Sequence, residues 1–390
     1  MKLKKIIRYS TQVISKDDVS SVSKALKSSF ITEGPLINNF EKKLTNYTKS
    51  KYATIVNSAS SALIIACGAL GLKKNDFLWT SPISFVSSAN CAFFYNAKVD
   101  FVDINQNSFN LDVNQLELKL SKAKKQKKLP KIIVVVHLGG NPCDMKKIKR
   151  LSKKYKFSVI EDASHALGAN YKNIKIGNPK YSDLSILSFH PVKMITTGEG
   201  GALMSNDYNL DKKIKSLRSH GIVREKKYLV NKKLPKWYYE QKYLSSNYRM
   251  TAFQAALGIS QLKKIDKFTK ERNNLAGIYE KKLKKLNIKF QLIDKNNKSS
   301  RHLFIILVDK KIRNKLYFYL EKNKIQTNLH YIPIYRHPYY KKFRFNKKNY
   351  KNSERYYEEA LSIPLHCNIS RKEQNYVINK IEYFLMINKR

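Results

Sequence analysis

Between Tyr52 and about Ser205, short runs of β-branched and other apolar residues alternate with amphipathic or polar stretches. This alternation is typical of a parallel sheet wrapped by helices, and continuous apolar runs indicate strands covered on both faces. Helices are expected from Ser60 to Leu70 and near Phe85 to Tyr95. Seven strands are expected, at 53–56, 77–80, 99–104, 132–138, 157–162, 184–189 and 201–205. The pattern therefore predicts an α/β fold for this part of the chain.

The pattern changes after Met250. An Ala-rich helix, TAFQAALGISQLKK, is followed by a Lys-rich helix near 267–286, a strand at 303–308 and a terminal helix near 372–386. A chain of 390 residues also exceeds the size at which single cores stop growing, roughly 250 to 300 residues. We expect a large domain at residues 1–250, with an N-terminal arm, and a smaller α+β domain at 251–390.

The chain carries 76 Lys and Arg residues against 29 Asp and Glu, a formal charge of +47, which raises nucleic-acid binding as a hypothesis. The lysines, however, are spread over nearly every segment. They are either ordinary surface residues or a source of electrostatic attraction for anionic substrates. No apolar run is long enough for a signal peptide or a membrane span, so a soluble cytoplasmic enzyme is expected. The four cysteines form no CxxC pair and indicate buried thiols in a reducing compartment, with no metal site.

Lys193 lies in SFHPVKMITTGEGG, just after a buried strand and before a Thr/Gly-rich turn. The carboxyl ends of parallel strands border the usual ligand crevice of open α/β sheets, so this amine is expected to project into a site. Apolar walls and a nearby cation lower the pKa of an amine and make it a nucleophile toward carbonyls. Schiff-base chemistry is therefore feasible, although most lysines of such a chain are plain surface residues.

EDASHALGA begins where another strand ends. Asp162 can face the crevice and pair with a protonated pyridine nitrogen, and His165 can hydrogen-bond a ring phenolate oxygen. The ordinary alternatives are a solvated loop carboxylate and a core histidine.

NSASSAL supplies small residues between a strand and a helix, where backbone N–H groups bind phosphate. Ala59 and Ser60 are the expected donors, and Ser188 can add a hydroxyl. Ordinary helix capping by Ser60 is compatible with this role. Phe85 can stack on a cofactor ring or be a plain core residue.

Together these segments resemble the DegT/DnrJ/EryC1/StrS family of sugar aminotransferases over nearly the whole chain. The resemblance implies the fold of aspartate aminotransferase, a fold type I PLP-dependent transferase with a mostly parallel seven-stranded sheet and a smaller C-terminal α+β domain. It implies that pyridoxal 5′-phosphate is the cofactor and Lys193 its Schiff-base lysine. It also implies that Asp162 faces the pyridine nitrogen and that Ala59, Ser60 and Ser188 hold the phosphate.

The resemblance further implies a homodimer with shared active sites, in which Asn247, followed closely by Arg249, reaches the phosphate of the partner subunit. The segments SPISFVSSANCAFF, VVVHLGGNP, WYYEQ and LHYIPIYRHPYY are most similar to the branch of pseudaminic acid biosynthesis. That branch aminates the UDP-linked sugar 2-acetamido-2,6-dideoxy-β-L-arabino-hex-4-ulose with L-glutamate as donor. The nucleotide-sugar contacts then fall on Tyr9, Ser29, Phe30, Ile31, Thr32, Gly139, Asn328, Leu329, His330 and Tyr331.

Two departures from the family concern substrate fit: SSNYRM around Asn247, and Glu33 where Gln is common. The retained Lys193 argues against the dehydratase branch, which has His at this position. The expected function is transfer of an amino group to the 4-keto carbon of the UDP sugar. Another 4-keto sugar, such as a GDP-hexulose or a UDP-pentulose, remains an alternative acceptor. A nucleic-acid-binding protein is the remote alternative, and neither nucleic acid nor membrane is expected as a partner.

Overall fold

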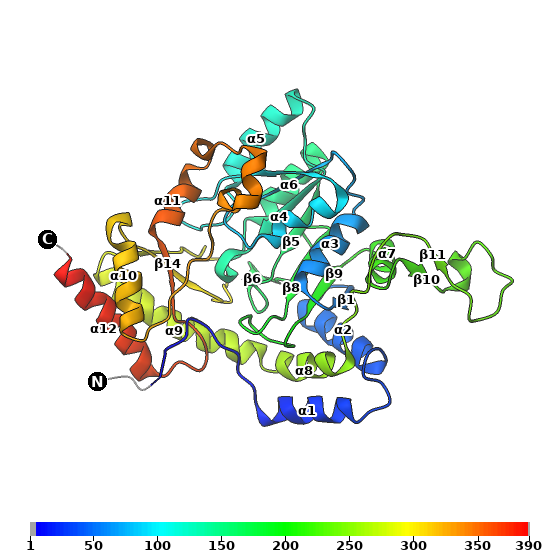
Figure 1. The fold of residues 1–390 in the computed structure, drawn as a ribbon, viewed down its shortest axis with the longest axis horizontal. Helices are drawn as coiled ribbons and strands as arrows, with labels where there is room; N and C mark the ends of the chain where they lie inside the picture. Colours follow the sequence, from blue (N-terminus) through cyan, green and yellow to red (C-terminus); the bar gives the residue numbers. More distant parts are fainter. Residues whose placement is uncertain (1–4, 389–390) are drawn as a thin grey trace.

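The computed structural model describes residues 5–388. A seven-stranded sheet lies at the centre with helices on both faces, a three-stranded sheet with its own helices lies beside it, and a two-stranded arm projects away (Figure 1). The expected α/β architecture is confirmed, and all seven expected strands are present within a few residues. The expected helix near Phe85 to Tyr95 is reduced to α4 (Ser87–Asn90) and a short 3-10 turn. Serine is a weak helix former, and here the hydroxyls of Ser84 and Ser88 bond each other at 2.8 Å.

The central sheet has the strand order β1-β9-β8-β5-β4-β2-β3. β9 runs antiparallel to β1 and β8, and every other pair is parallel. The carboxyl ends of the parallel strands therefore meet along one edge, where open α/β sheets bind ligands. The strands are β1 (Tyr52–Val56), β2 (Phe77–Thr80), β3 (Lys98–Phe101), β4 (Ile132–Val136), β5 (Ser158–Asp162), β8 (Leu184–Ser188) and β9 (Gly201–Ser205).

Apolar clusters cover both faces of this sheet. In β4, Ile133 and Val135 join one cluster while Ile132 and Val134 join the other, as the two-residue period of a strand requires. The first cluster includes side chains from α2 (Pro35–Thr48), α5 (Val113–Lys125), α6 (Met145–Tyr155) and α8 (Ala252–Leu262). The second includes side chains from α3 (Ala59–Ala69), α4 and α7 (Tyr208–Arg218). Double coverage explains why these strands read as continuous apolar runs.

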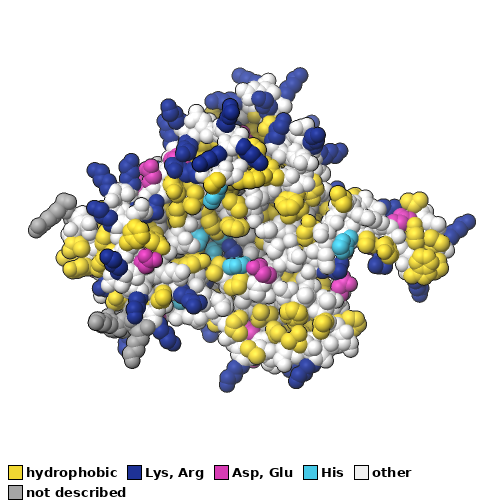
Figure 2. Space-filling view, viewed as in Figure 1, with side chains coloured by type: hydrophobic (Ala, Val, Ile, Leu, Met, Phe, Trp, Pro, Cys, Tyr) yellow, Lys and Arg dark blue, Asp and Glu magenta, His cyan; other side chains and the backbone are white. Residues whose placement is uncertain are grey.

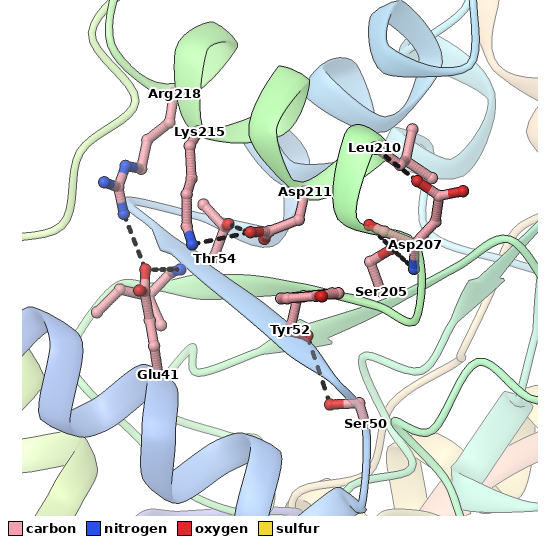
Figure 3. A network of polar contacts seen from close by, with 11 residues as sticks. Glu41, Ser50, Tyr52, Thr54, Ser205, Asp207, Leu210, Asp211, Lys215 and Arg218 are labelled. Atoms are coloured by element: carbon pink, nitrogen blue, oxygen red, sulfur yellow. Dashed lines mark hydrogen bonds and ion pairs between the residues drawn. The ribbon is translucent and has the colours of Figure 1, made fainter. Parts of the chain in front are cut away.

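A polar network fixes the edge strand β1 between α2 and α7 (Figure 3). Glu41 Oε1 accepts the backbone N–H of Ile55 at 3.1 Å and pairs with Arg218 Nη1 at 2.8 Å. Asp211 accepts the hydroxyl of Thr54 at 3.0 Å and pairs with Lys215 Nζ at 2.8 Å. Because β1 leads directly into α3, these contacts also hold the beginning of that helix.

The C-terminal part has a third apolar core, which Ile7 from the N-terminal end also joins. The backbone of Ile7 pairs with that of Ile325, so the chain around Ile7 lies against this C-terminal part. α1 (Lys16–Leu26) and α8 lie side by side, and α8 packs on the central sheet. The helices and strands of the C-terminal part are α9 (Ile265–Lys285), β12 (Lys289–Phe290), β13 (Phe304–Leu307), α10 (Lys310–Lys322), α11 (Lys351–Glu359), β14 (Ala360–Ile363) and α12 (Arg371–Ile387). The domain boundary near residue 250 stays a prediction.

Two small hairpins complete the fold. β6 (Asn170–Tyr171) pairs with β7 (Ile174–Lys175), and β10 (Ile222–Val223) pairs with β11 (Glu240–Gln241) at the base of the projecting arm, which comprises residues 222–244. Figure 2 shows apolar side chains on the arm, and histidines near the centre of the same face. None of the helices between residues 5 and 388 combines the length and apolar character that a membrane crossing requires.

Candidate active site

Lys193 lies in the loop that joins β8 to β9. The loop is closed at its base, where Phe189 N–H donates to Gly200 O at 2.9 Å and Thr197 N–H donates to Phe189 O at 2.9 Å. Burial lowers the pKa of the Lys193 amine to about 8, although the carboxylate of Asp162 acts in the opposite direction. A sizeable neutral fraction therefore exists near neutral pH, which a nucleophilic or basic amine requires.

Asp162 is buried at the carboxyl end of β5, on the strand next to β8. Its Oδ2 accepts the hydroxyl of Ser88 at 2.7 Å, and its Oδ1 accepts the backbone N–H of Ser164 at 3.2 Å. Ser88 is in turn bonded to Ser84 at 2.8 Å. The carboxylate is therefore held in one orientation from two sides, as pairing with a fixed cationic ring nitrogen requires.

His165 is buried on the turn after β5, and its ring has a defined tautomer. Burial first, and Lys193 next, hold the pKa of this imidazole well below its usual value, so the ring is neutral. Its Nδ1 lies 3.2 Å from the backbone N–H of Gly139, which can only donate, so Nδ1 is the acceptor. The ring proton is consequently on Nε2, which lies 3.1 Å from the hydroxyl of Tyr331. The expected contact with a cofactor oxygen stays a prediction.

The beginning of α3 has the properties of an anion site. Ser58 caps the helix by accepting the N–H of Ser61 at 3.1 Å. Within the described chain, the N–H groups of Ala59 and Ser60 have no acceptor. Gly201 packs directly against this turn, because a Cβ there would lie 2.6 Å from the nitrogen of Ala59. Two free amides at a helix N-terminus fit a phosphate, which favours the expected cradle.

The other expected cofactor contacts border this region. Ser188 ends β8 opposite Gly201, and the hydroxyl of Ser60 pairs with that of Ser87 at 2.8 Å. Phe85 is 58% exposed, and its ring lies 6.1 Å from that of Tyr331. Phe85 is thus not a core residue, and an apolar ring open to the site is available for stacking.

Asn247 is exposed and lies beside the strand–helix junction of its own chain. Its carbonyl accepts from Asn57 Nδ2 at 3.5 Å, and its side-chain oxygen accepts the backbone N–H of Arg249 at 3.2 Å. Contact with the phosphate of a partner subunit stays a prediction.

Several expected sugar contacts lie together. The rings of Tyr9 and His330 are 5.3 Å apart, and His330 Nε2 lies 3.5 Å from Asn328 Nδ2. The hydroxyl of Tyr9 also pairs with Asn328, and burial raises the pKa of this phenol. Tyr331 connects the group to His165. Leu329 packs in the adjoining apolar cluster.

The remaining expected contacts are divided between the molecular surface and the site. Residues 29–32 form an exposed segment between α1 and α2, tied to the start of α8 because Ile31 O accepts the N–H of Ala252 at 3.0 Å. Gly139 is buried, and its N–H is engaged by His165. The structure thus brings the 328–331 group to the site, while 29–32 lies open to solvent.

Sequence analysis did not identify two residues of the site, Ser88 and His302. Ser88 orients Asp162, and the imidazole of His302 packs on that of His165 with ring centroids 4.4 Å apart. Ser88 follows the second strand, which is the only signal that could have indicated it. Nothing in SSRHLF marks His302, because its place depends on a contact between distant parts of the chain.

The site has few formal charges. Burial, with a contribution from Lys193, lowers the pKa of His330 to about 3 and that of His302 well below its usual value. Three neutral imidazoles, those of His165, His302 and His330, therefore lie near the Lys193 amine. The amine and the carboxylate, Lys193 and Asp162, are left to bind and polarise a ligand.

Comparison with known proteins identifies close relatives. The family described as "DegT/DnrJ/EryC1/StrS aminotransferase family" matches residues 12–382. A UDP-4-amino-4,6-dideoxy-N-acetyl-beta-L-altrosamine transaminase of Campylobacter jejuni is 40% identical over 377 residues, which cover 95% of this chain and 96% of the relative. A transaminase of the same name from Helicobacter pylori is 34% identical and covers 93% of each chain.

Solved structures agree with these sequence relatives. Helicobacter pylori PseC, described as an aminotransferase involved in the biosynthesis of pseudoaminic acid, is 31% identical with a TM-score of 0.87, covering 97% of this chain and 99% of that chain. The PLP-form of a putative sugar aminotransferase from Streptococcus pneumoniae is 26% identical with a TM-score of 0.87, covering 97% and 98%.

Proposed function

Because the chain belongs to the DegT/DnrJ/EryC1/StrS aminotransferase family, we propose that it transfers the amino group of L-glutamate to a UDP-linked 4-keto sugar. The acceptor is UDP-2-acetamido-2,6-dideoxy-β-L-arabino-hex-4-ulose, and the product is UDP-4-amino-4,6-dideoxy-N-acetyl-β-L-altrosamine, the sugar named for the relatives in Campylobacter jejuni and Helicobacter pylori. The observation that carries the proposal is the Lys193 amine with its lowered pKa beside the oriented carboxylate of Asp162.

The residues present fit pyridoxal 5′-phosphate. Lys193 would hold its aldehyde carbon, Asp162 its ring nitrogen, and the free amides of Ala59 and Ser60 its phosphate. Ser188 and Phe85 border the same space. When bound, this cofactor supplies an electron sink that stabilises a carbanion at the carbon bearing the amino group.

Lys193 is the residue that moves protons. Its Nζ takes up the proton that the α-carbon of the donor releases and later supplies one to C4 of the sugar. A pKa of about 8 suits both directions, because neither the neutral nor the protonated amine is rare near neutral pH. Asp162 keeps its orientation through Ser88 and Ser164, so the ring nitrogen would meet a fixed negative charge.

The arm supports a homodimer with shared active sites. Figure 2 shows apolar side chains on the arm. Three apolar side chains of this segment are largely exposed: Val230 at 84%, Trp237 at 69% and Leu244 at 93%. Soluble chains rarely leave such a group uncovered, and a second copy would bury it. The arm leads directly to Asn247, so the same contact would deliver that side chain to the neighbouring site.

A cytoplasmic location is also part of the proposal. Cys67, Cys91 and Cys143 are buried free thiols, and Cys367 is a partly buried one. Free thiols are the normal state in a reducing compartment.

The direct test is incubation of the purified protein with pyridoxal 5′-phosphate, L-glutamate and the UDP 4-keto sugar. Mass spectrometry should show an amino sugar together with 2-oxoglutarate, and initial rates should follow a ping-pong pattern. The Lys193→Ala variant is the control and should form neither product. Comparison with a GDP-hexulose and a UDP-pentulose tests the acceptor, and strong preference for either would contradict the substrate assignment.

The nucleic-acid-binding alternative leaves the arrangement of Lys193, Asp162 and the helix amides without a role. A steep salt-dependent affinity for DNA in a protein without transaminase activity would support it instead.

A further inference from the structure

Residues Ser299 to Leu303, here termed the strap, connect the C-terminal part of the chain to the turn that follows β4 of the central sheet. The strap holds the turn at Gly139 and Gly140 through three hydrogen bonds. Ser299 Oγ donates to Gly140 O at 2.9 Å, and the N–H of Ser300 donates to the same oxygen at 3.2 Å. The N–H of Leu303 donates to Gly139 O at 3.4 Å. A segment remote in sequence therefore determines where the N–H of Gly139 lies.

The strap also contacts His165 directly. Ser300 Oγ donates to His165 O at 2.6 Å, and the ring of His302 packs on the ring of His165. Gly140 packs closely against Ser300 and His165, because a Cβ on Gly140 would lie 2.0 Å from Ser300 Oγ and 2.8 Å from His165 O. His165 is thus held at its carbonyl, at its ring face and, through Gly139, at Nδ1.

Arg272 of α9 anchors the strap from behind. It is 3% exposed, and its Nη1 donates to Leu365 O at 2.7 Å, to His302 O at 3.2 Å and to Arg301 O at 3.4 Å. Between residues 5 and 388 no carboxylate forms an ion pair with it. The thiol of Cys367 is a further side-chain partner of Arg272. The bonds of this buried guanidinium to backbone carbonyls fix the position of the strap, since its planar group sets the direction of the bonds it makes.

We propose that the strap, anchored by Arg272, positions His165 against the cofactor, so that Ser300 and Arg272 are positioning residues for amino transfer. The proposal rests on the proposed function of the site. The Nε2–H of His165 is the group on this imidazole that can donate, and the hydroxyl of Tyr331, 3.1 Å away, lies beside it. Small displacements of such groups reduce catalysis strongly. The C-terminal part of the chain thereby controls a side chain that the central sheet carries.

The test is a double-mutant cycle on the affinity of the apo-protein for pyridoxal 5′-phosphate, measured by equilibrium dialysis. Ser300→Ala should weaken this affinity roughly fivefold, the change that corresponds to one neutral hydrogen bond. In a His165→Gln background the same change should weaken it less than about twofold, because the group it positions is gone. Equal weakening in both backgrounds, or no weakening in either, would overturn the proposal.

Arg272→Lys and Arg313→Met complete the design. Arg272→Lys keeps the charge but loses the planar group, and should weaken cofactor affinity in the wild-type background only. Arg313 also bonds backbone carbonyls, Glu358 O at 3.1 Å and Tyr357 O at 2.9 Å, away from the strap. Arg313→Met should leave cofactor affinity unchanged even if the melting temperature falls. No sugar substrate is used, so failure here is distinguishable from failure of the proposed function.

Discussion

Gly201→Ala should damage the phosphate cradle without replacing any residue that we assign to cofactor binding or proton transfer. A Cβ at this position would lie 2.6 Å from the nitrogen of Ala59 and from the carbonyl carbon of Ser58, and 2.8 Å from Ser58 O. Ordinary contacts begin at 3.4 Å, so the beginning of α3 must move by about 0.8 Å. All three atoms belong to the backbone, and β1 is held by the Glu41 and Asp211 network, so no flexible side chain absorbs the shift.

The expected loss follows from the two amides that this shift misaligns. A hydrogen bond to a charged group contributes about 1.5 to 3 kcal/mol, so losing one of them should weaken the binding of pyridoxal 5′-phosphate about 10- to 100-fold. Overpacking should also lower the free energy of unfolding by about 1 to 3 kcal/mol. Titration of the apo-protein with the cofactor measures the first effect, and urea unfolding of the apo-protein measures the second.

Gly277→Ala is the matched control. The chemical change is the same, but a Cβ at Gly277 meets nothing within 4 Å, and the position lies inside α9. Alanine favours a helix interior over glycine by about 1 kcal/mol, so this variant should be slightly more stable and bind the cofactor normally. If Gly201→Ala bound the cofactor as tightly as the wild type, the assignment of the cradle to Ala59 and Ser60 would be wrong.

Three further predictions concern the reacting groups and the arm. The rate at which the apo-protein condenses with pyridoxal 5′-phosphate should rise as pH increases through about 8, because the Lys193 amine is mostly neutral, and therefore nucleophilic, only above its pKa. Stopped-flow absorbance measures this rate. A midpoint near 10.5 would contradict the argument that burial lowers the pKa. Asp162→Asn should lower turnover at least 100-fold with little change in melting temperature, because the fixed charge facing the ring nitrogen is lost; a variant within tenfold of the wild type would exclude that pairing. Trp237→Glu together with Leu244→Glu should shift the protein toward monomers and lower the activity per chain, because both exposed apolar side chains are replaced by charged ones. Light scattering after gel filtration measures the mass of the particle. An unchanged dimer would place the interface elsewhere.

Much of the fold could be predicted because it is local in sequence. The strands around Val135 and Ile160 are buried on both faces, so their apolar character is continuous and readable without a structure. Lys193, Asp162 and Ser60 were found for a related reason. Each lies at or shortly after the carboxyl end of a strand, and the carboxyl ends of parallel strands meet at one edge of the sheet.

The contacts that orient these groups could not be predicted, because they join segments far apart in the chain. Ser88 reaches Asp162 from α4, and Tyr331 and His302 reach His165 from more than 130 residues away. A lowered pKa of Lys193 was expected from apolar walls and a nearby cation, and the structure assigns it to burial.

The sequence by itself determined the order of strands and helices, the family and the residues available for chemistry, since periodicity and motif spacing are properties of neighbouring residues. Only the tertiary structure decided which nitrogen of His165 carries the proton, which residues hold the Asp162 carboxylate, and that a strap from the C-terminal part supports the site. Hydrogen-bond direction and burial are set by atoms that meet after folding, and no local pattern encodes them.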